Sequence, residues 1–174
     1  MDTYAPFSLR YHNRDGGTAH APMRRVPVGN GGDTIKKGDP VLVEAGVAAD
    51  YVAGDGLFGV AVNLFPTYDA SAGKDAPDLN HALIYPAGDE AIVYRVQARN
   101  IESAEDVVIA ASDVLGNTFN LSGSAGALYL DVASAGSDFT VIDIEDTVSD
   151  WGDLYPVLLV KIANIQDVDP SIAT

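Results

Sequence analysis

The chain has 174 residues, with ten basic and 25 acidic side chains and a net charge of −15 at neutral pH. This length accommodates one or at most two domains, and an apolar content of 47% is sufficient for a hydrophobic core. The negative charge argues against binding to nucleic acid or to anionic lipid, which both attract cationic surfaces. The absence of cysteine excludes disulfides and thiolate metal sites.

The first ten residues carry an acid at position 2 and no long apolar run, so they do not resemble a signal peptide. No stretch approaches the ~20 apolar residues that span a bilayer. We therefore expect a protein that is made in the cytoplasm and stays soluble until it meets a partner.

Basic residues are concentrated near the N-terminus. Residues 1–37 carry six bases and three acids, whereas residues 38–174 carry four bases and 22 acids, giving net charges of +3 and −18. Glycine pairs and prolines interrupt the first segment at short intervals and prevent a long helix. We predict an extended basic arm at residues 1–34 and an acidic all-β body at residues 35–174. The arm either packs along its own body or docks on a partner.

Short apolar runs rich in β-branched residues follow one another from residue 35, with turn signals between them. We expect strands at residues 41–43, 57–62, 92–99, 128–132, 139–144 and 157–165, and loops at residues 66–80, 122–126 and 134–138. Residues 103–115 fit a helix or a strand. About eight short strands without alternating helices predict a compact β-barrel or sandwich.

The clearest strand signal is the alternation in residues 92–99. Ile92, Tyr94, Val96 and Ala98 share one face of an extended chain, and polar residues occupy the other face. This pattern is typical of a strand that is buried on one side.

The glycines at positions 54, 56 and 59 match the spacing of a dinucleotide-binding loop. Such a loop requires a helix at these glycines so that its positive end meets the pyrophosphate. An apolar strand pattern follows instead, so we interpret these residues as turn glycines. Neither a phosphate-binding lysine loop nor a serine nucleophile elbow has the required spacing.

Metal ligands and catalytic residues are poorly marked. His12, His20 and His81 lack a spacing that would place two nitrogens on one metal. Adjacent acids such as Glu145 and Asp146 point to opposite faces of a strand, so we expect them at solvated turns and strand ends. We therefore predict no catalytic residue, no metal, no cofactor and no enzymatic activity.

Two further signals leave alternatives open. The acids at positions 143, 145, 146, 150 and 153 offer oxygen ligands for calcium, although their spacing is not that of an EF-hand. Trp151 is either a core anchor or a platform on which a sugar stacks. For the protein as a whole, a further alternative is an enzyme whose catalytic carboxylates come from distant strands.

Several segments resemble the capsid decoration, or cement, proteins of tailed bacteriophages. Residues 4–10 are similar to the Pro-Phe-Gly-Leu-Arg opening of this family, with Ser8 in place of the usual glycine. Residues 35–62 contain a Gly-Asp-Pro-Val strand opening, a turn and then a Gly-Val strand. Residues 92–97 and 157–164 resemble two later strands, whereas residues 100–135 match weakly.

The resemblance implies a non-enzymatic structural protein of the virion, assembled in the host cytoplasm. It would bind the outer surface of the phage head as a homotrimer and stabilise contacts between capsomers of the major capsid protein. The alternative is a virion surface module for adhesion, such as a head fibre that binds carbohydrate. The residues expected to bind the capsid are the apolar and basic side chains of the arm: Tyr4, Phe7, Leu9, Arg10, Tyr11, Arg14, Arg24 and Arg25.

Overall fold

The computed structural model confirms an all-β protein that contains a closed barrel. For residues 8–11, 65–69 and 74–80 it describes only the backbone. The described residues are 8–11, 23–28, 35–69, 74–88, 92–102, 104–146 and 148–166.

The first sheet closes on itself. Its strands follow the order β1-β7-β11-β10-β12-β13, and β13 also pairs with β7. These strands are β1 (Ser8–Tyr11), β7 (Ile92–Arg99), β10 (Thr118–Ser124), β11 (Ala127–Asp131), β12 (Phe139–Ile144) and β13 (Val157–Ile162). The pairing of β13 with β7 makes a five-stranded barrel, and β1 lies outside this ring on β7.

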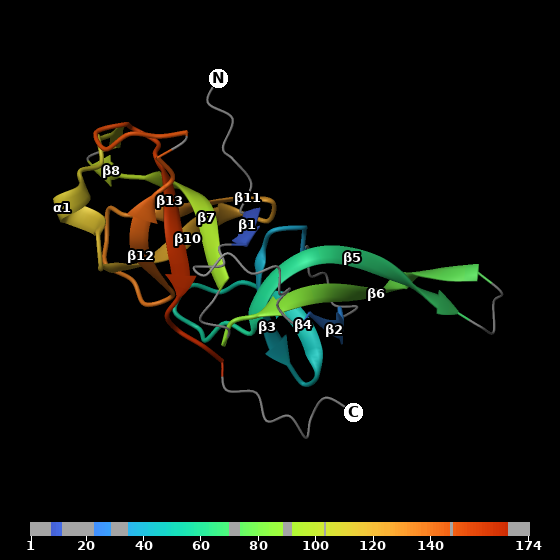
Figure 1. Ribbon diagram of the computed structural model, residues 1–174. Helices are drawn as coiled ribbons and strands as arrows, with labels where there is room; N and C mark the ends of the chain where they lie inside the picture. The colour runs from blue at the N-terminus through green and yellow to red at the C-terminus, as the bar shows by residue number, and fades with distance from the viewer. Residues whose placement is uncertain are drawn as a thin grey trace.

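The second sheet carries a long hairpin. Its strands follow the order β2-β6-β5-β3-β4. They are β2 (Arg24–Pro27), β3 (Pro40–Glu44), β4 (Val47–Asp50), β5 (Gly59–Asp69) and β6 (Lys74–Pro86). A parallel bridge between Val28 and Ala48 connects the end of β2 with β4. The hairpin of β5 and β6 extends well beyond the other strands of this sheet (Figure 1).

Three short elements complete the described chain. Strands β8 (Ile101–Glu102) and β9 (Glu105–Asp106) form a small ribbon, and α1 (Ala111–Val114) is a single helical turn. The sequence predicted either a helix or a strand over residues 103–115. The structure has both β9 and α1 in this range, with an irregular stretch between them. The β-branched run at residues 107–109 belongs to neither.

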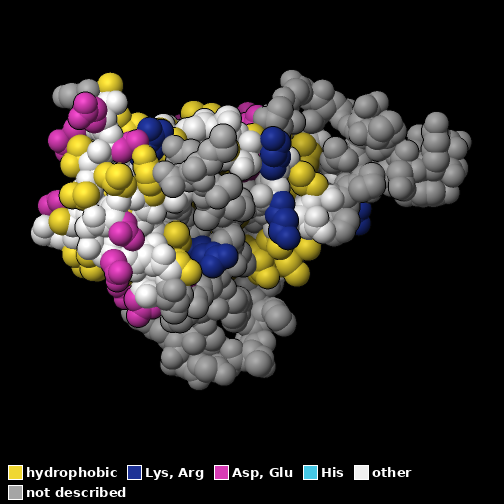
Figure 2. Space-filling view, turned by 90° about the horizontal axis from the view of Figure 1, so that it is seen from above, with side chains coloured by type: hydrophobic (Ala, Val, Ile, Leu, Met, Phe, Trp, Pro, Cys, Tyr) yellow, Lys and Arg dark blue, Asp and Glu magenta, His cyan; other side chains and the backbone are white. Residues whose placement is uncertain are grey.

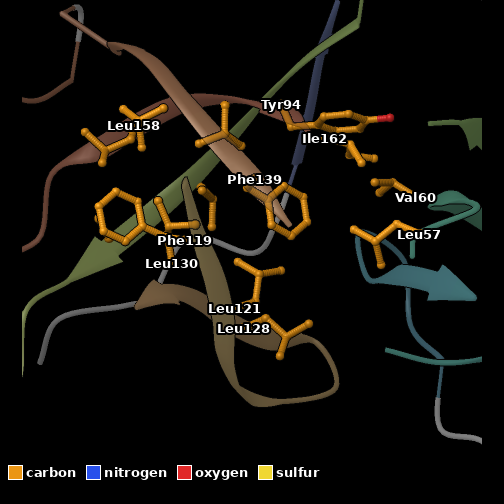
Figure 3. Close-up of a cluster of buried hydrophobic side chains, with 14 of the residues drawn as sticks. Leu57, Val60, Tyr94, Phe119, Leu121, Leu128, Leu130, Phe139, Leu158 and Ile162 are labelled. Atoms are coloured by element: carbon orange, nitrogen blue, oxygen red, sulfur yellow. The ribbon is translucent and has the colours of Figure 1, made fainter. Parts of the chain in front are cut away.

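Each sheet encloses a group of buried apolar side chains. The larger group fills the barrel and includes Tyr94, Phe139 and Leu158 (Figure 3). It also receives Leu57, which precedes β5, and Val60 of β5 itself, so the barrel core continues across the junction. The smaller group lies in the second sheet and consists of Val26, Ile35, Val41, Ala48, Ala61, Ala82 and Ile84.

Two of the predicted strands are confirmed at their exact bounds, residues 92–99 and 139–144. In β7 the four alternating apolar residues are buried as expected. The loop predicted at residues 66–80 is wrong, because β5 continues to Asp69 and β6 begins at Lys74. Small residues and aspartates indicated a loop, but β5 and β6 pair within this stretch, and the ladder accommodates Pro66 at a register shift.

Both described stretches of the predicted arm pair with strands of the body. Strand β1 pairs antiparallel with β7, and β2 pairs antiparallel with β6. Val26 of β2 is buried in the smaller core. These stretches therefore follow the alternative in which the N-terminal segment packs along its own body.

Candidate functional site

The predicted capsid-binding residues divide into three groups. Tyr4, Phe7 and Arg14 lie outside the described residues. The backbones of Leu9, Arg10 and Tyr11 belong to β1 and pair, in that order, with Tyr94, Val93 and Ile92 of β7. The structure thus places this group on one edge of the barrel, and Arg24 and Arg25 on the second sheet.

Arg24 and Arg25 lie on β2 at the base of the long hairpin. Both side chains are exposed, and their Cα partners on β6 are Ile84 and Leu83. The guanidinium of Arg24 lies over the ring of Phe58, 6.0 Å from its centroid, a distance at which a cation is attracted to an aromatic face. Stacking of this kind orients a cationic side chain while leaving its polar edge available to a partner.

His81 on β6 experiences the charge of Arg25. Burial of the imidazole and the nearby Arg25 cation lower the pKa of His81. This shift favours the neutral imidazole, so the arginines carry the positive charge at the base of the hairpin.

Positive and negative side chains are unevenly distributed over the surface. Residues 92–166 carry three bases and 11 acids, a net charge of −8, whereas residues 23–88 carry five bases and eight acids, a net charge of −3. In Figure 2 the acidic side chains gather mainly on the side away from the hairpin, and most visible Lys and Arg side chains lie closer to it. The charge asymmetry of the sequence thus becomes an asymmetry between the two sheets.

Two buried carboxylates at the junction of the sheets escaped the sequence analysis. Asp138 is fully buried at the start of β12, and Asp39, 4% exposed, precedes β3. Asp39 accepts hydrogen bonds from the backbone N–H groups of Lys36, at 2.9 Å, and Gly126, at 2.8 Å. Burial raises the pKa of Asp39. Because Gly126 belongs to the turn between β10 and β11, this carboxylate joins the two sheets.

Asp138 makes a second and denser connection. Its Oδ2 accepts hydrogen bonds from the Tyr51 hydroxyl at 2.6 Å and the Gly54 N–H at 2.9 Å. Its Oδ1 accepts from the Asn164 amide at 3.2 Å and from the neighbouring Ser137 hydroxyl at 3.0 Å. Oδ2 therefore holds the segment after β4 against the barrel, while Oδ1 binds residues next to β12 and β13.

A cavity of about 280 Å³ opens at this junction. Asp39, Asp50 and Tyr51 line one side, and the β10–β11 hairpin lines the other. Asp39 is bound to two backbone N–H groups, and the Tyr51 hydroxyl bridges Asp138 and the backbone N–H of Leu121. These polar groups join the two sheets, and we assign them a structural role.

The acids considered for calcium do not form a metal site. Within the described part of the chain, no three His, Cys, Asp or Glu side chains are close enough together to hold a metal ion. Asp143, Asp146, Asp150 and Asp153 are exposed. Glu145 is 1% exposed, so the expectation that it lies at a solvated strand end is wrong. The chain turns inward after β12, where the Glu145 N–H donates to the carbonyl of Val157.

The glycine motif at positions 54–59 acts as a turn followed by a strand. Gly54 has a φ of +90°, which favours glycine, and β5 begins at Gly59. A side chain at Gly59 would place its Cβ 2.0 Å from the carbonyl oxygen of Tyr85. The interpretation as a turn glycine is therefore confirmed for Gly54, whereas close approach of two strands explains Gly59.

Trp151 packs against the core of the barrel. It is half-buried and contacts the larger apolar group. This placement supports its interpretation as a core anchor over that of a sugar-stacking platform.

Comparison with known proteins gives no match: no family model, no curated protein and no solved structure matches this chain. None of the helices in the described residues has the length and apolar character needed to cross a membrane.

Proposed function

We propose that this protein is a capsid decoration, or cement, protein of a tailed bacteriophage. It binds the outer surface of the head as a homotrimer and joins neighbouring capsomers of the major capsid protein. The observation that carries this proposal is the β5–β6 hairpin, which projects from a body of two connected sheets (Figure 1). The resemblance of the N-terminal and strand segments to this protein family supports it.

A clamp between capsomers needs a body that does not deform and an element that reaches beyond it. The carboxylates of Asp39 and Asp138 connect the two sheets through buried hydrogen bonds, which resist separation of the sheets. The hairpin contributes the reach, because strands of 11 and 13 residues are far longer than their neighbours β2, β3 and β4.

Much of the hairpin has no third strand beside it. Strand β3 pairs with β5 at Gly59 and Val60, and β2 pairs with β6 from His81 to Ile84. Among the described strands, β5 and β6 are each other's only partner over the outer part of the hairpin. A two-stranded ribbon is only marginally stable in water, so a surface that covers this part stabilises it.

The arginines at the base of the hairpin suit an acidic partner surface. Arg24 and Arg25 are exposed, and guanidinium groups bind carboxylates through paired hydrogen bonds. The acidic remainder of the chain keeps free copies apart before assembly through like-charge repulsion. The major capsid protein of the mature head is the partner that the resemblance implies.

The decisive experiment measures binding of the purified protein to expanded phage heads and the resistance of these heads to heat. We expect Arg24→Glu/Arg25→Glu to weaken binding at least tenfold. The matched control is Lys36→Glu/Lys37→Glu, which changes the net charge equally at two exposed residues outside β2 and leaves binding close to wild type. Equal binding by both variants and the wild type would show that Arg24 and Arg25 do not contribute to the interface with the capsid.

A second variant tests the hairpin itself. Phe65 and His81 are Cα partners, so replacing residues 66–80 by Asn-Gly joins them through a two-residue turn and leaves the β2–β6 pairing intact. We expect a folded protein that no longer raises the heat resistance of heads. Wild-type protein that fails to bind any expanded head, or a shortened variant that protects heads fully, contradicts the proposed function.

A further inference from the structure

Strand β7 has an unusual division of partners along one edge. Along its other edge, residues 94–97 of β7 pair antiparallel with residues 157–160 of β13. On the divided edge, β1 pairs with residues 92–95, and β11 pairs in parallel with Ala98 and Arg99 alone. The barrel therefore closes on this side through a ladder of two residue pairs, and β1 occupies the remainder.

The part of β7 that pairs with β1 begins with three buried residues. Ile92 and Tyr94 are 2% and 1% exposed, and Val93 is also buried. Backbone N–H and C=O groups at such a position need partners, and an uncovered edge next to an apolar core readily accepts another strand. Residues 92–95 thus form a strand-acceptor edge, which β1 fills.

The donor strand is short, and its connection to the rest of the chain is long. Strand β1 has four residues, stands at the end of the strand order and pairs with β7 alone among the described strands. Twelve residues separate it from β2, which belongs to the other sheet. Twelve residues span up to ~40 Å, more than enough for the strand to reach a neighbouring copy of the chain.

We propose that β1 is an exchangeable strand: in the assembled homotrimer, β1 of one copy pairs with residues 92–95 of the next copy. This inference rests on the proposed function, which holds several copies side by side on one shell. The residue pairings are the same within one chain and between two, so local concentration decides between them. A short tether gives an effective concentration of about millimolar, which neighbouring copies on a shell also reach.

Exchange in one direction around three copies closes a ring in which each copy holds the next. Dissociation of one copy then requires two strand pairings to break, its own and that of its neighbour. The exchanged strand thereby strengthens the trimer without any new contact surface.

The absence of cysteine allows a direct test with full-length protein. Ser8 and Arg95 are Cα partners, and partners in an antiparallel ladder lie within the range that a disulfide spans. The single variants Ser8→Cys and Arg95→Cys are mixed at about millimolar concentration, refolded together and oxidised. We expect disulfide-linked pairs that contain one chain of each variant, identified by intact-mass spectrometry under non-reducing conditions.

The matched control uses the other edge of β7. Arg95 also pairs with Leu159 of β13, which belongs to the same barrel in every arrangement. A mixture of Arg95→Cys and Leu159→Cys should therefore give only background cross-linking between chains. Circular dichroism checks that each variant is folded, and exposed Arg95 is a tolerant position for substitution.

Two results together would contradict the exchange of β1 between copies. The mixture of Ser8→Cys and Arg95→Cys would give no more mixed disulfide than the control, and the double variant Ser8→Cys/Arg95→Cys would form its disulfide within one chain. That outcome leaves the proposed cement function intact, because head binding is measured separately. Conversely, mixed disulfides together with failure to bind heads would overturn the function and retain the exchange.

Discussion

The hydroxyl of Tyr51 donates a 2.6 Å hydrogen bond to the buried carboxylate of Asp138, 87 positions later in the chain. The same hydroxyl accepts a hydrogen bond from the backbone N–H of Leu121 at 3.0 Å. Burial and the neighbouring Asp138 carboxylate raise the pKa of Tyr51, so the hydroxyl remains a donor at physiological pH. One phenol therefore connects the segment after β4 with β10 and with the residue that precedes β12.

Removal of either partner should destabilise the junction between the sheets. We expect Tyr51→Phe to lower the free energy of unfolding by about 1–3 kcal/mol, because it leaves the Leu121 N–H unpaired and takes a donor from a buried carboxylate. Asp138→Ala should cost about 3 kcal/mol or more, since several donors lose their acceptor. Urea denaturation measures both changes.

Tyr85→Phe is the control for these variants. Tyr85 is half-buried against the barrel core, and its hydroxyl makes no hydrogen bond within the described residues. Its loss should change stability by less than about 0.5 kcal/mol. A Tyr51→Phe variant as stable as Tyr85→Phe would show that the junction does not depend on this hydrogen bond.

Gly59→Ala should disrupt the start of the long hairpin. The added Cβ would lie 2.0 Å from the Tyr85 carbonyl oxygen and 2.7 Å from a methyl carbon of Ile84, so β5 and β6 would have to separate. We expect a loss of at least about 3 kcal/mol in thermal or chemical denaturation. Gly88→Ala is the matched control, because nothing lies within 4 Å of its Cβ position. Similar stability of the two variants contradicts the close approach at Gly59.

Ala45→Asn should stabilise the turn between β3 and β4. Ala45 has a φ of +48° and precedes Gly46 at +81°, the left-handed pair of a two-residue hairpin. Asparagine tolerates this conformation better than alanine, so the free energy of unfolding should rise by about 0.5–1 kcal/mol. Ala135→Asn is the control, since Ala135 is exposed and has no positive φ. An equal gain in both variants would point away from the turn conformation.

The ion pair between Arg99 and Asp106 should contribute a pH-dependent part of the stability. Hydrogen bonds from Arg99 and then from the Tyr155 hydroxyl hold the pKa of Asp106 below its ordinary value. A lowered folded-state pKa gives stability that is present above about pH 4 and is lost as the pH falls through the folded-state pKa. The advantage of the wild type over Asp106→Asn in denaturation should therefore be full at pH 7 and shrink below pH 4. A constant difference between pH 7 and pH 3 would contradict this contribution.

Local patterns predicted the central strands well. The alternation in residues 92–99 fixed which side chains of β7 face the core, because a strand that is buried on one face repeats every two residues. Residues 66–80 failed for the opposite reason. Their small residues, prolines and acids are typical of a loop, whereas β5 continues to Asp69 and β6 begins at Lys74.

The polar junction could not be predicted from local patterns. Asp39 and Asp138 look like solvated turn residues, since each follows a glycine or serine in a polar stretch. Their burial depends on donors that lie far away in sequence, such as Gly126 for Asp39 and Tyr51 for Asp138. Arg24 and Arg25 were identified by charge alone, and only β2 places them beside the hairpin.

The sequence by itself determined the all-β class, the exclusion of thiol chemistry and the separation of a basic N-terminal segment from an acidic remainder. These properties follow from composition and from side-chain periods of two, which are local. Only the tertiary structure decided that β13 closes the barrel on β7 and that three acids are buried. It also decided that β1 pairs with β7 of the first sheet and β2 with β6 of the second. Strand pairing uses backbone N–H and C=O groups that are the same in nearly every residue, so the choice of partner is made by the packing of the whole chain.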